Sequence, residues 1–316
     1  MIVARLKTFF KSEPTTVLLA AAFFAALLAG QVIGNTDPTT LLARAAIFAL
    51  AALSLSFILG QGGMVSLGHA APMGLGAYVT LTLALFGIKD FFVVTALAFI
   101  AGAAFSGLTG LIALRTRGVY FIMITLAFAQ MAFYAMSSLS IFGGTDGMAL
   151  PVRSTVFGWP LFRMDGATAL VGLLLLTAAY GGIMRVTRSR FGMVLRASHL
   201  NESRAVALGF EPLTYRLLAY SFAGGLSAVS GVLLANLTDY ISPSFLDWHR
   251  SGELIVMVVL GGVARPFGAI LGAFALIYIE SLVGGFTQYW NLVLGLVLLA
   301  IVLLRGRLES RLKAAP

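Results

Sequence analysis

The chain has 316 residues, of which 59% are hydrophobic and only 10% are charged, and its formal net charge is +9. A water-soluble domain carries about 25% charged residues, so this composition excludes an ordinary globular protein. The absence of cysteine excludes disulfides, thiolate metal sites and cysteine nucleophiles. The positive charge does not indicate nucleic-acid binding, because the basic residues stand in short segments between long apolar stretches.

Each apolar stretch is about as long as a bilayer is thick, since roughly 20 helical residues span a hydrocarbon core of about 30 Å. The first follows a basic segment, but its apolar run is too long for a typical signal peptide, so we expect a retained helix. The pattern predicts an all-α integral membrane protein with glycine-broken or re-entrant segments. The ten predicted transmembrane helices are 15–34, 41–60, 63–87, 91–114, 119–142, 166–186, 217–236, 251–264, 267–285 and 289–304.

The basic residues predict the orientation of these helices. An even number of crossings puts both termini on the same side of the membrane. If that side is the cytoplasm, most of the 21 basic residues lie in cytoplasmic segments, as is typical of membrane proteins. The exceptions, in or beside outside segments, are Arg44, Lys89, Arg153, Arg163 and Arg250. Two loops are longer than a connection needs, the outside loop 143–165 and the inside loop 185–216, and long loops are often functional.

The segment 60–78 interrupts an apolar stretch with several glycines and a proline. These residues weaken a helix, and freed backbone groups are costly in lipid, so the segment must face protein or a wet cavity. One interpretation is a substrate pathway or gate; the other is close helix packing through small residues. Its polar residues are Gln61, Ser66 and His69, and a lone histidine is more typical of packing than of a ligand or proton carrier.

The inside loop predicts two short helical pieces. Asn201 can cap the second, Glu202 stands in its first turn and Gly209 can end it. Apolar residues alternate with charges, so this helix could lie on the bilayer surface or in a groove of a partner protein. The residues by themselves favour neither partner.

Two further motifs contain glycine pairs. Residues 143–147 in the outside loop are typical of a tight turn, and the simplest interpretation is a loop that closes two helices. Gly261 and Gly262 interrupt an apolar run before Pro266, which predicts another broken helix that ends at the inner surface. The sequence has no nucleotide-binding, metalloprotease or paired-carboxylate motif of an enzyme.

Taken together, these segments resemble the permeases of branched-chain amino acid ABC transporters, and most closely the longer of the two paired permeases. Residues 60–71 with 74–78 are similar to the N-terminal signature of that family, and 143–147 to its outer-loop motif. Residues 196–209 are similar to its cytoplasmic coupling loop, and 258–273 to its C-terminal signature. The resemblance covers most of residues 60–280.

The resemblance implies one permease domain over residues 1–316 in the bacterial inner membrane, a transport subunit and not an enzyme. It implies import of branched-chain amino acids, although the family also carries urea, short amides and aromatic acids. The partners it implies are a second, probably different, permease subunit, two cytoplasmic ATPase subunits that hold ATP and Mg²⁺, and a periplasmic substrate-binding protein. No cofactor or metal is expected in this chain.

The resemblance also assigns the inside loop to a groove of the ATPase. The residues expected to couple to it are Arg196, Asn201, Glu202, Arg204, Ala205, Leu208 and Gly209. The residues expected along the pathway or gate are Gln61, Gly62, Gly63, Ser66, Gly68, His69, Gly261 and Gly262, and those of the outer loop are Gly144, Thr145, Asp146 and Gly147. The alternative is a proton-coupled secondary transporter that uses Glu253, Glu280 or His69. An intramembrane enzyme is disfavoured, because the chain lacks a convergent catalytic set.

Overall fold

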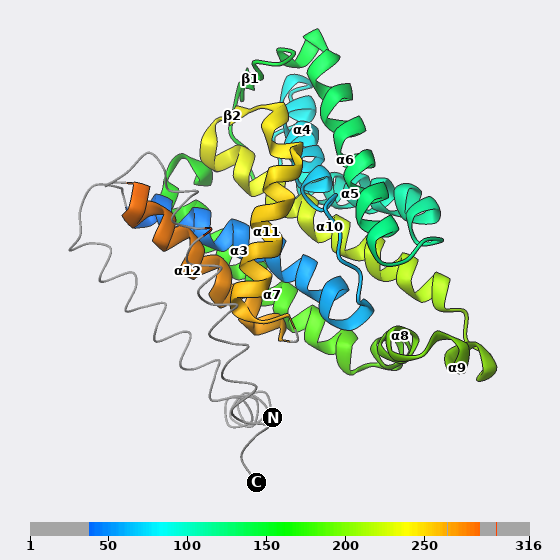
Figure 1. Cartoon of the computed structure of the whole chain (residues 1–316). Helices are drawn as coiled ribbons and strands as arrows, with labels where there is room; N and C mark the ends of the chain where they lie inside the picture. Colours follow the sequence, from blue (N-terminus) through cyan, green and yellow to red (C-terminus); the bar gives the residue numbers. More distant parts are fainter. Residues whose placement is uncertain (1–37, 264, 285–294, 296–316) are drawn as a thin grey trace.

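The computed structural model describes residues 38–263, 265–284 and 295. This part of the chain is mainly helical (Figure 1), as the all-α prediction requires. The α-helices are α3 (Pro38–Gly62), α4 (Ala70–Leu85), α5 (Phe91–Ala113), α6 (Val119–Ser138), α7 (Asp165–Arg188), α8 (Arg190–Leu200), α9 (Glu202–Ala207), α10 (Pro212–Thr238), α11 (Trp248–Gly261) and α12 (Pro266–Gly284). The short elements are η1 (Ser140–Phe142), β1 (Met148–Ala149), η2 (Leu161–Arg163), β2 (Tyr240–Ile241) and η3 (Pro243–Leu246).

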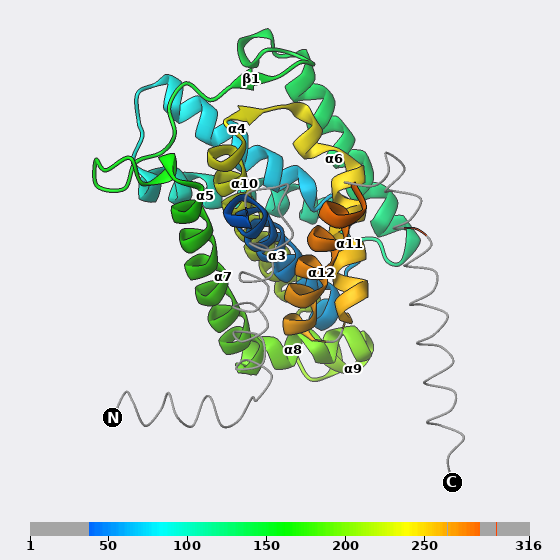
Figure 2. The same ribbon diagram turned by 90° about the vertical axis from the view of Figure 1, so that its left-hand side faces the viewer.

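Helix α3 lies in the centre of the molecule, as Figure 2 shows. It contacts α7, α10, α11 and α12, and nearly all of its residues are buried. Helix α10 packs against α3, α4 and α5 and forms the second part of the core. By contrast, only 22–28% of the residues in the apolar spans of α5, α6 and α7 are buried. A helix that is apolar all round must be covered by protein or by lipid, and these three helices therefore present apolar surface for lipid or for a partner subunit.

Six of the described helices are long and apolar enough to cross a membrane, namely α3, α5, α6, α7, α10 and α12. The protein is a multi-pass membrane protein. Helices α4 and α11 coincide with two more predicted crossings but have only 16 and 14 residues. The predicted crossings 15–34 and 289–304 lie outside the described residues, so the total of ten stays a prediction. The predicted helix 63–87 was wrong at its start, because residues 63–69 are not helical and α4 begins at Ala70.

The loops separate into two groups at opposite ends of the bundle. At one end, the α3–α4 connection, the α5–α6 loop and the α8–α9 segment line one pocket. At the other end, β1 pairs with β2, and Thr155 forms a bridge with Asp90 at the start of α5. These are the groups that the charge pattern assigned to the inside and the outside, respectively. Which group faces the cytoplasm stays a prediction.

Helices α4 and α10 cross at glycines, which let their backbones touch. A Cβ added to Gly76 would lie 2.0 Å from the carbonyl oxygen of Ala228, and one added to Gly231 would lie 1.8 Å from that of Met73. Both neighbours are backbone atoms and cannot rotate away. The small residues of α4 therefore serve helix packing.

Replacing Gly76 by Ala should destabilise the detergent-solubilised protein by about 2 kcal/mol, because the two helices must separate. Thermal unfolding followed by tryptophan fluorescence measures this effect. The matched control is Gly181→Ala in α7, where no described atom lies within 4 Å of the added Cβ. Equal stability of the two variants would contradict the close contact between α4 and α10.

Candidate functional site

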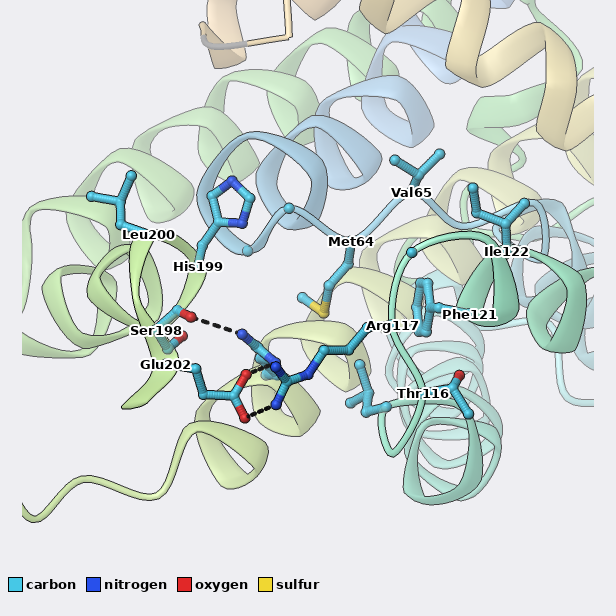
Figure 3. Close-up of a pocket in the computed structure, with 15 residues that line it drawn as sticks. Met64, Val65, Thr116, Arg117, Phe121, Ile122, Ser198, His199, Leu200 and Glu202 are labelled. Atoms are coloured by element: carbon cyan, nitrogen blue, oxygen red, sulfur yellow. Dashed lines mark hydrogen bonds and ion pairs between the residues drawn. The ribbon is translucent and has the colours of Figure 1, made fainter. Parts of the chain in front are cut away.

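The main feature of the end predicted to lie inside is a pocket of about 390 Å³ at the junction of four chain segments (Figure 3). Its walls come from the glycine-rich segment after α3, the α5–α6 loop with the first turn of α6, the α8–α9 segment and Arg216 of α10. One side of the pocket is apolar, and the other carries charged and backbone groups. The lining residues are Gly62, Gly63, Met64, Val65, Leu114, Thr116, Arg117, Gly118, Phe121, Ile122, Ser198, His199, Leu200, Glu202 and Arg216.

Glu202 stands between two arginines of other elements at this pocket. Its Oε1 accepts a hydrogen bond from Arg117 Nη2 at 2.6 Å, and its Oε2 lies 2.9 Å from Arg216 Nη1. The second contact is an ion pair without hydrogen-bond geometry, because Oε2 has no hydrogen-bond partner among the described residues. Arg216 also donates to the Ser198 carbonyl at 2.8 Å. Glu202 thus links α9 to α10 and to the α5–α6 loop.

The two arginines differ in burial. The side chain of Arg216 is 13% exposed, whereas that of Arg117 is 71% exposed. Losing its ion-pair partner costs a largely buried charge more free energy than it costs an exposed charge. The Glu202–Arg216 pair therefore stabilises the contact between α9 and α10. The exposed Arg117 can leave its contact with Glu202 at a smaller cost in free energy.

The segment between α3 and α4 is not helical, as expected for a broken helix. Side chains of other helices satisfy its backbone groups: Ser251 Oγ of α11 accepts from the Ala70 N–H at 2.9 Å, and Ser227 Oγ of α10 donates to the His69 carbonyl at 2.9 Å. Unsatisfied backbone groups at membrane depth cost several kcal/mol each. These serines therefore make the break tolerable and join α4 to α10 and α11.

The polar side chains of the break are buried around this junction. Ser66 Oγ lies 3.2 Å from the Tyr220 hydroxyl, and His69 Nε2 lies 2.7 Å from Ser54 Oγ. His69 is 2% exposed, so its environment is that of a hydrogen-bonded packing residue. Gln61 is also buried, and its Oε1 has no hydrogen-bond partner among the described residues. Gln61, Ser66 and His69 are not part of the pocket lining.

Two glycines of the break touch other elements directly. Gly63 has a φ of +66°, and a Cβ at this position would lie 2.1 Å from the imidazole of His199 in α8. A Cβ on Gly68 would lie 2.5 Å from the carbonyl oxygen of Thr125 in α6. Among the predicted gate residues, only Gly62 and Gly63 line the pocket. The contact of Gly63 with His199 brings the inside loop against the end of the central helix.

Gly261 and Gly262 lie at a different place, where α11 ends and α12 returns. Gly262 has a φ of +98°, and a Cβ on Gly261 would lie 1.7 Å from the carbonyl oxygen of Gly268. The predicted interruption is therefore present, and it allows α11 and α12 to pack closely. The structure does not bring these two glycines to the pocket.

The inside loop forms the two predicted helices, α8 and α9. Asn201 Oδ1 accepts from the Arg204 N–H at 3.0 Å and caps α9. Gly209 ends the turn with a φ of +84°, and Phe210 N–H donates back to the Ala205 carbonyl at 3.1 Å. This arrangement is the left-handed C-terminal motif that glycine favours. Both helix boundary predictions are confirmed.

The predicted coupling residues divide by exposure. Arg196, Asn201, Arg204, Leu208 and Gly209 are exposed, Glu202 is partly buried and Ala205 is buried. Large apolar side chains are also exposed on this segment, namely Met193, Leu200, Val206 and Leu208. The segment therefore presents a mixed basic and apolar outer surface, while Glu202 and Ala205 face the rest of the protein.

The outside end is held by the Gly143–Gly147 motif and its neighbours. Gly143, Gly144 and Gly147 have positive φ, and the carbonyl of Asp146 accepts a hydrogen bond from the Tyr240 hydroxyl. Thr145 and Asp146 are exposed at the turn. The prediction of a tight turn is confirmed, and the turn leads directly into the β1–β2 pair.

Arg153 joins the outer loop to two transmembrane helices. Its Nε donates to Asp239 Oδ1 at 2.6 Å, and its Nη1 lies 3.6 Å from Asp165 Oδ1 at the start of α7. The hydrogen bonds to Asp239 raise the pKa of Arg153 above its ordinary value, so the guanidinium stays charged. Asn236 Oδ1 accepts from the Ser154 N–H at 2.6 Å beside this pair. The outer loop is thus fixed to the end of α10.

The two acidic residues of the predicted crossings have basic partners. Glu253 lies 2.8 Å from Arg250, and Glu280 lies 2.8 Å from Arg44 of α3. In the described part of the chain, no group of three or more histidines or carboxylates is close enough to hold a metal ion.

The profile of one protein family, described as the permease component of branched-chain amino acid transport systems, matches residues 38–302. This chain belongs to that family. The match includes the glycine-rich break, the outer turn, the α8–α9 segment and the α11–α12 return. No solved structure matched the chain at a significant level.

The permease is similar to the high-affinity branched-chain amino acid transport permease LivM of Salmonella typhimurium. The two are 27% identical over 282 residues, which cover 82% of this chain and 66% of LivM. LivM of Escherichia coli is 26% identical over 282 residues, which again cover 82% of this chain and 66% of LivM. The matched region is therefore just under two thirds of the length of these relatives. The permease LsrC of the autoinducer 2 import system of Salmonella typhi is 29% identical over 180 residues, 54% of this chain and 51% of LsrC.

Of the ionisable residues that line the permease pocket, Arg117, His199 and Arg216 were not among the predicted site residues. In the sequence, the two arginines served only as markers of the inside face. Their distance from Glu202 along the chain does not predict an ion pair, because Arg117 is 85 positions away. A carboxylate predicted in a largely basic inside loop could have indicated that some arginine must pair with it.

Proposed function

We propose that this permease is the membrane subunit of an ABC importer that carries branched-chain or other small hydrophobic amino acids into the cytoplasm. Separate ATPase subunits would bind ATP and Mg²⁺, and a periplasmic protein would deliver the substrate. A second permease subunit would complete the pathway in the bacterial inner membrane. The observation that carries this proposal is the pocket, at which the α8–α9 segment contacts α10 and the α5–α6 loop through Glu202 and the broken helix through His199 on Gly63.

The exposed side of α8–α9 supports the assignment of the ATPase contact. Its basic and apolar residues suit a groove in a partner, and Glu202 and Ala205 face inward. When the ATPases close on ATP, the segment would move as a short rigid lever. Glu202 would pass this movement to α10 and to the α5–α6 loop, and His199 would pass it to the end of α3. The result would be alternating access along the central helices.

The chemistry of the core supports a hydrophobic amino acid as substrate. The buried residues of α3, α4 and α10 are apolar or carry neutral hydroxyl and amide groups, apart from His69. A small zwitterion with an apolar side chain can pass such a lining without the removal of water from protein charges. The relatives named for branched-chain amino acids point in the same direction. The alternative substrates are urea, short amides, aromatic acids or, from the LsrC likeness, autoinducer 2.

Uptake by proteoliposomes tests this function. We expect labelled leucine to accumulate only when the permease, its partner permease, the ATPases, the binding protein and ATP are all present. Calorimetry of the binding protein with leucine, urea and aromatic acids identifies the substrate class. Accumulation against a gradient by this chain alone, without nucleotide, would overturn the proposal.

A proton-coupled secondary transporter is less well supported. Such a carrier needs ionisable groups that can exchange protons along a path. Glu253 and Glu280 are each paired with an arginine, and His69 is hydrogen-bonded by Ser54 in a buried site. These contacts do not favour a proton relay.

A further inference from the structure

The outer loop of the permease contains a hairpin turn with two central residues, Val156–Trp159, which we call the aromatic turn. Val156 and Trp159 exchange both backbone hydrogen bonds, at 3.0 and 2.9 Å. The two central residues, Phe157 and Gly158, have φ values of +50° and +83°. Positive φ at both positions is typical of a type I′ turn, where asparagine and glycine are preferred.

Phe157 is an unusual residue for its position. A bulky side chain in left-handed conformation costs roughly 1–2 kcal/mol, and such strain persists at sites where it serves a purpose. Packing inside the protein covers little of either ring, because Phe157 is 79% exposed and Trp159 is 76% exposed. Two large aromatic rings at the tip of a strained turn therefore need an apolar environment outside this chain.

The aromatic turn is attached to the start of α5. Thr155 N–H donates to the Lys89 carbonyl at 2.6 Å, and the Phe91 N–H donates to the Thr155 carbonyl at 2.8 Å. The ring of Phe157 packs on that of Phe92, with 5.3 Å between centroids. Figure 2 shows the loop between β1 and α7 projecting sideways beside the start of α5. The aromatic turn therefore occupies a defined place at the end of a membrane-spanning helix.

The exposed face of α5 continues directly into the turn. Its exposed residues recur at helical spacing and are apolar, namely Phe92, Val93, Ala96, Leu97, Ile100, Ala104, Leu108, Leu111 and Ile112. Such a face is covered by lipid in a membrane protein. Phe157 adds one more aromatic ring beyond Phe92, at the end of this apolar face. Lys89 and Arg163 are exposed beside the turn and can face lipid phosphates.

We propose that the aromatic turn inserts Phe157 and Trp159 into the headgroup boundary of the phospholipid bilayer and anchors the outer loop there. Aromatic rings favour this boundary, where one side is apolar and the other is wet. The continuity with the lipid-facing stripe of α5 favours the bilayer over a protein partner. The anchor would hold the outer loop, including Arg153, at a constant height above the membrane.

Fluorescence of Trp159 tests the proposal. The full-length chain with Trp248→Phe and Trp290→Phe keeps Trp159 as its one tryptophan. It is reconstituted in vesicles of phosphatidylcholine and phosphatidylglycerol with bromine either high or low on the acyl chain. We expect bromine high on the chain to quench emission roughly twofold, and more than bromine low on the chain, as for a ring at the interface. Quenching by aqueous iodide with no effect of brominated lipid would overturn the proposal.

Two further measurements distinguish a lipid anchor from a contact with protein. Phe157→Asn keeps a residue that suits positive φ, so the hairpin should remain while lipid quenching of Trp159 falls. Unchanged lipid quenching in this variant would contradict the role of Phe157. Addition of the binding protein and the partner permease is the last measurement. If Trp159 were protected from iodide only when one of these proteins is present, and brominated lipid did not quench it, the turn would contact protein and the proposal would be overturned.

Discussion

ATP-driven uptake should fall at least about tenfold when Glu202 is replaced by Gln, while the subunit still folds and still binds its ATPases. Removing one partner of a buried ion pair costs about 3–5 kcal/mol, and each 1.4 kcal/mol or so corresponds to about tenfold in a coupled equilibrium. Glutamine keeps the shape of the side chain but leaves Arg216, which is 13% exposed, without its charged partner. The measurement is initial uptake by the complete transporter, with co-purification of the ATPases as the check on assembly.

The control for Glu202 is an acidic residue of the same segment that does not bridge helices. Glu211 is exposed and accepts a hydrogen bond from the Thr214 hydroxyl at 3.3 Å, so Glu211→Gln should leave uptake nearly unchanged. A double-mutant cycle with Arg216→Gln should be non-additive, because both changes break the same 2.9 Å ion pair. Normal uptake in Glu202→Gln, or strict additivity in the cycle, would show that this link does not transmit movement.

Replacing Gly63 by Ala should also reduce uptake strongly, by about tenfold, because the added Cβ would lie 2.1 Å from the ring of His199. The imidazole can rotate away from the added methyl group. We therefore expect Gly63→Ala to disturb the contact between α8 and the break more than it lowers the stability of the fold. His199→Ala removes the same contact from the other side and should reproduce the loss of uptake. Both variants are measured by uptake and by thermal unfolding.

The conformational cost of Gly63→Ala needs its own control, since alanine is unfavourable at a φ of +66°. Gly87 has a φ of +80°, and no described atom lies within 4 Å of an added Cβ. Gly87→Ala therefore carries a similar backbone cost without a collision. If Gly87→Ala and Gly63→Ala lost uptake equally, the contact with His199 would have no special role.

The local features of the permease follow from its residues. The apolar stretches set the class and the approximate helix boundaries, since a membrane-spanning backbone must satisfy its hydrogen bonds within a helix. The break after α3, the Asn201 cap and the Gly209 end are likewise local, because each depends on the conformational preferences of a few adjacent residues. The charge pattern separated the loops into the two groups that meet at opposite ends of the bundle.

Other expectations depended on contacts between distant segments. Sequence alone left both packing and pathway open as interpretations of the glycine motifs, and the structure places Gly261 against Gly268 but Gly63 at the pocket. The sequence also could not tell that this chain encloses α3 but leaves much of α5 uncovered, because protein and lipid both accept the same apolar side chains.

Glu202 marks this division most clearly. Its place in the first turn of α9 was determined by the sequence, through the preference of Asn201 for the capping position. Its partners, Arg117 and Arg216, were decided only when the tertiary fold brought the α5–α6 loop and α10 to the same pocket. The physical reason is that ion pairing depends on distance in space, and helix packing sets that distance among residues with no fixed separation in the chain.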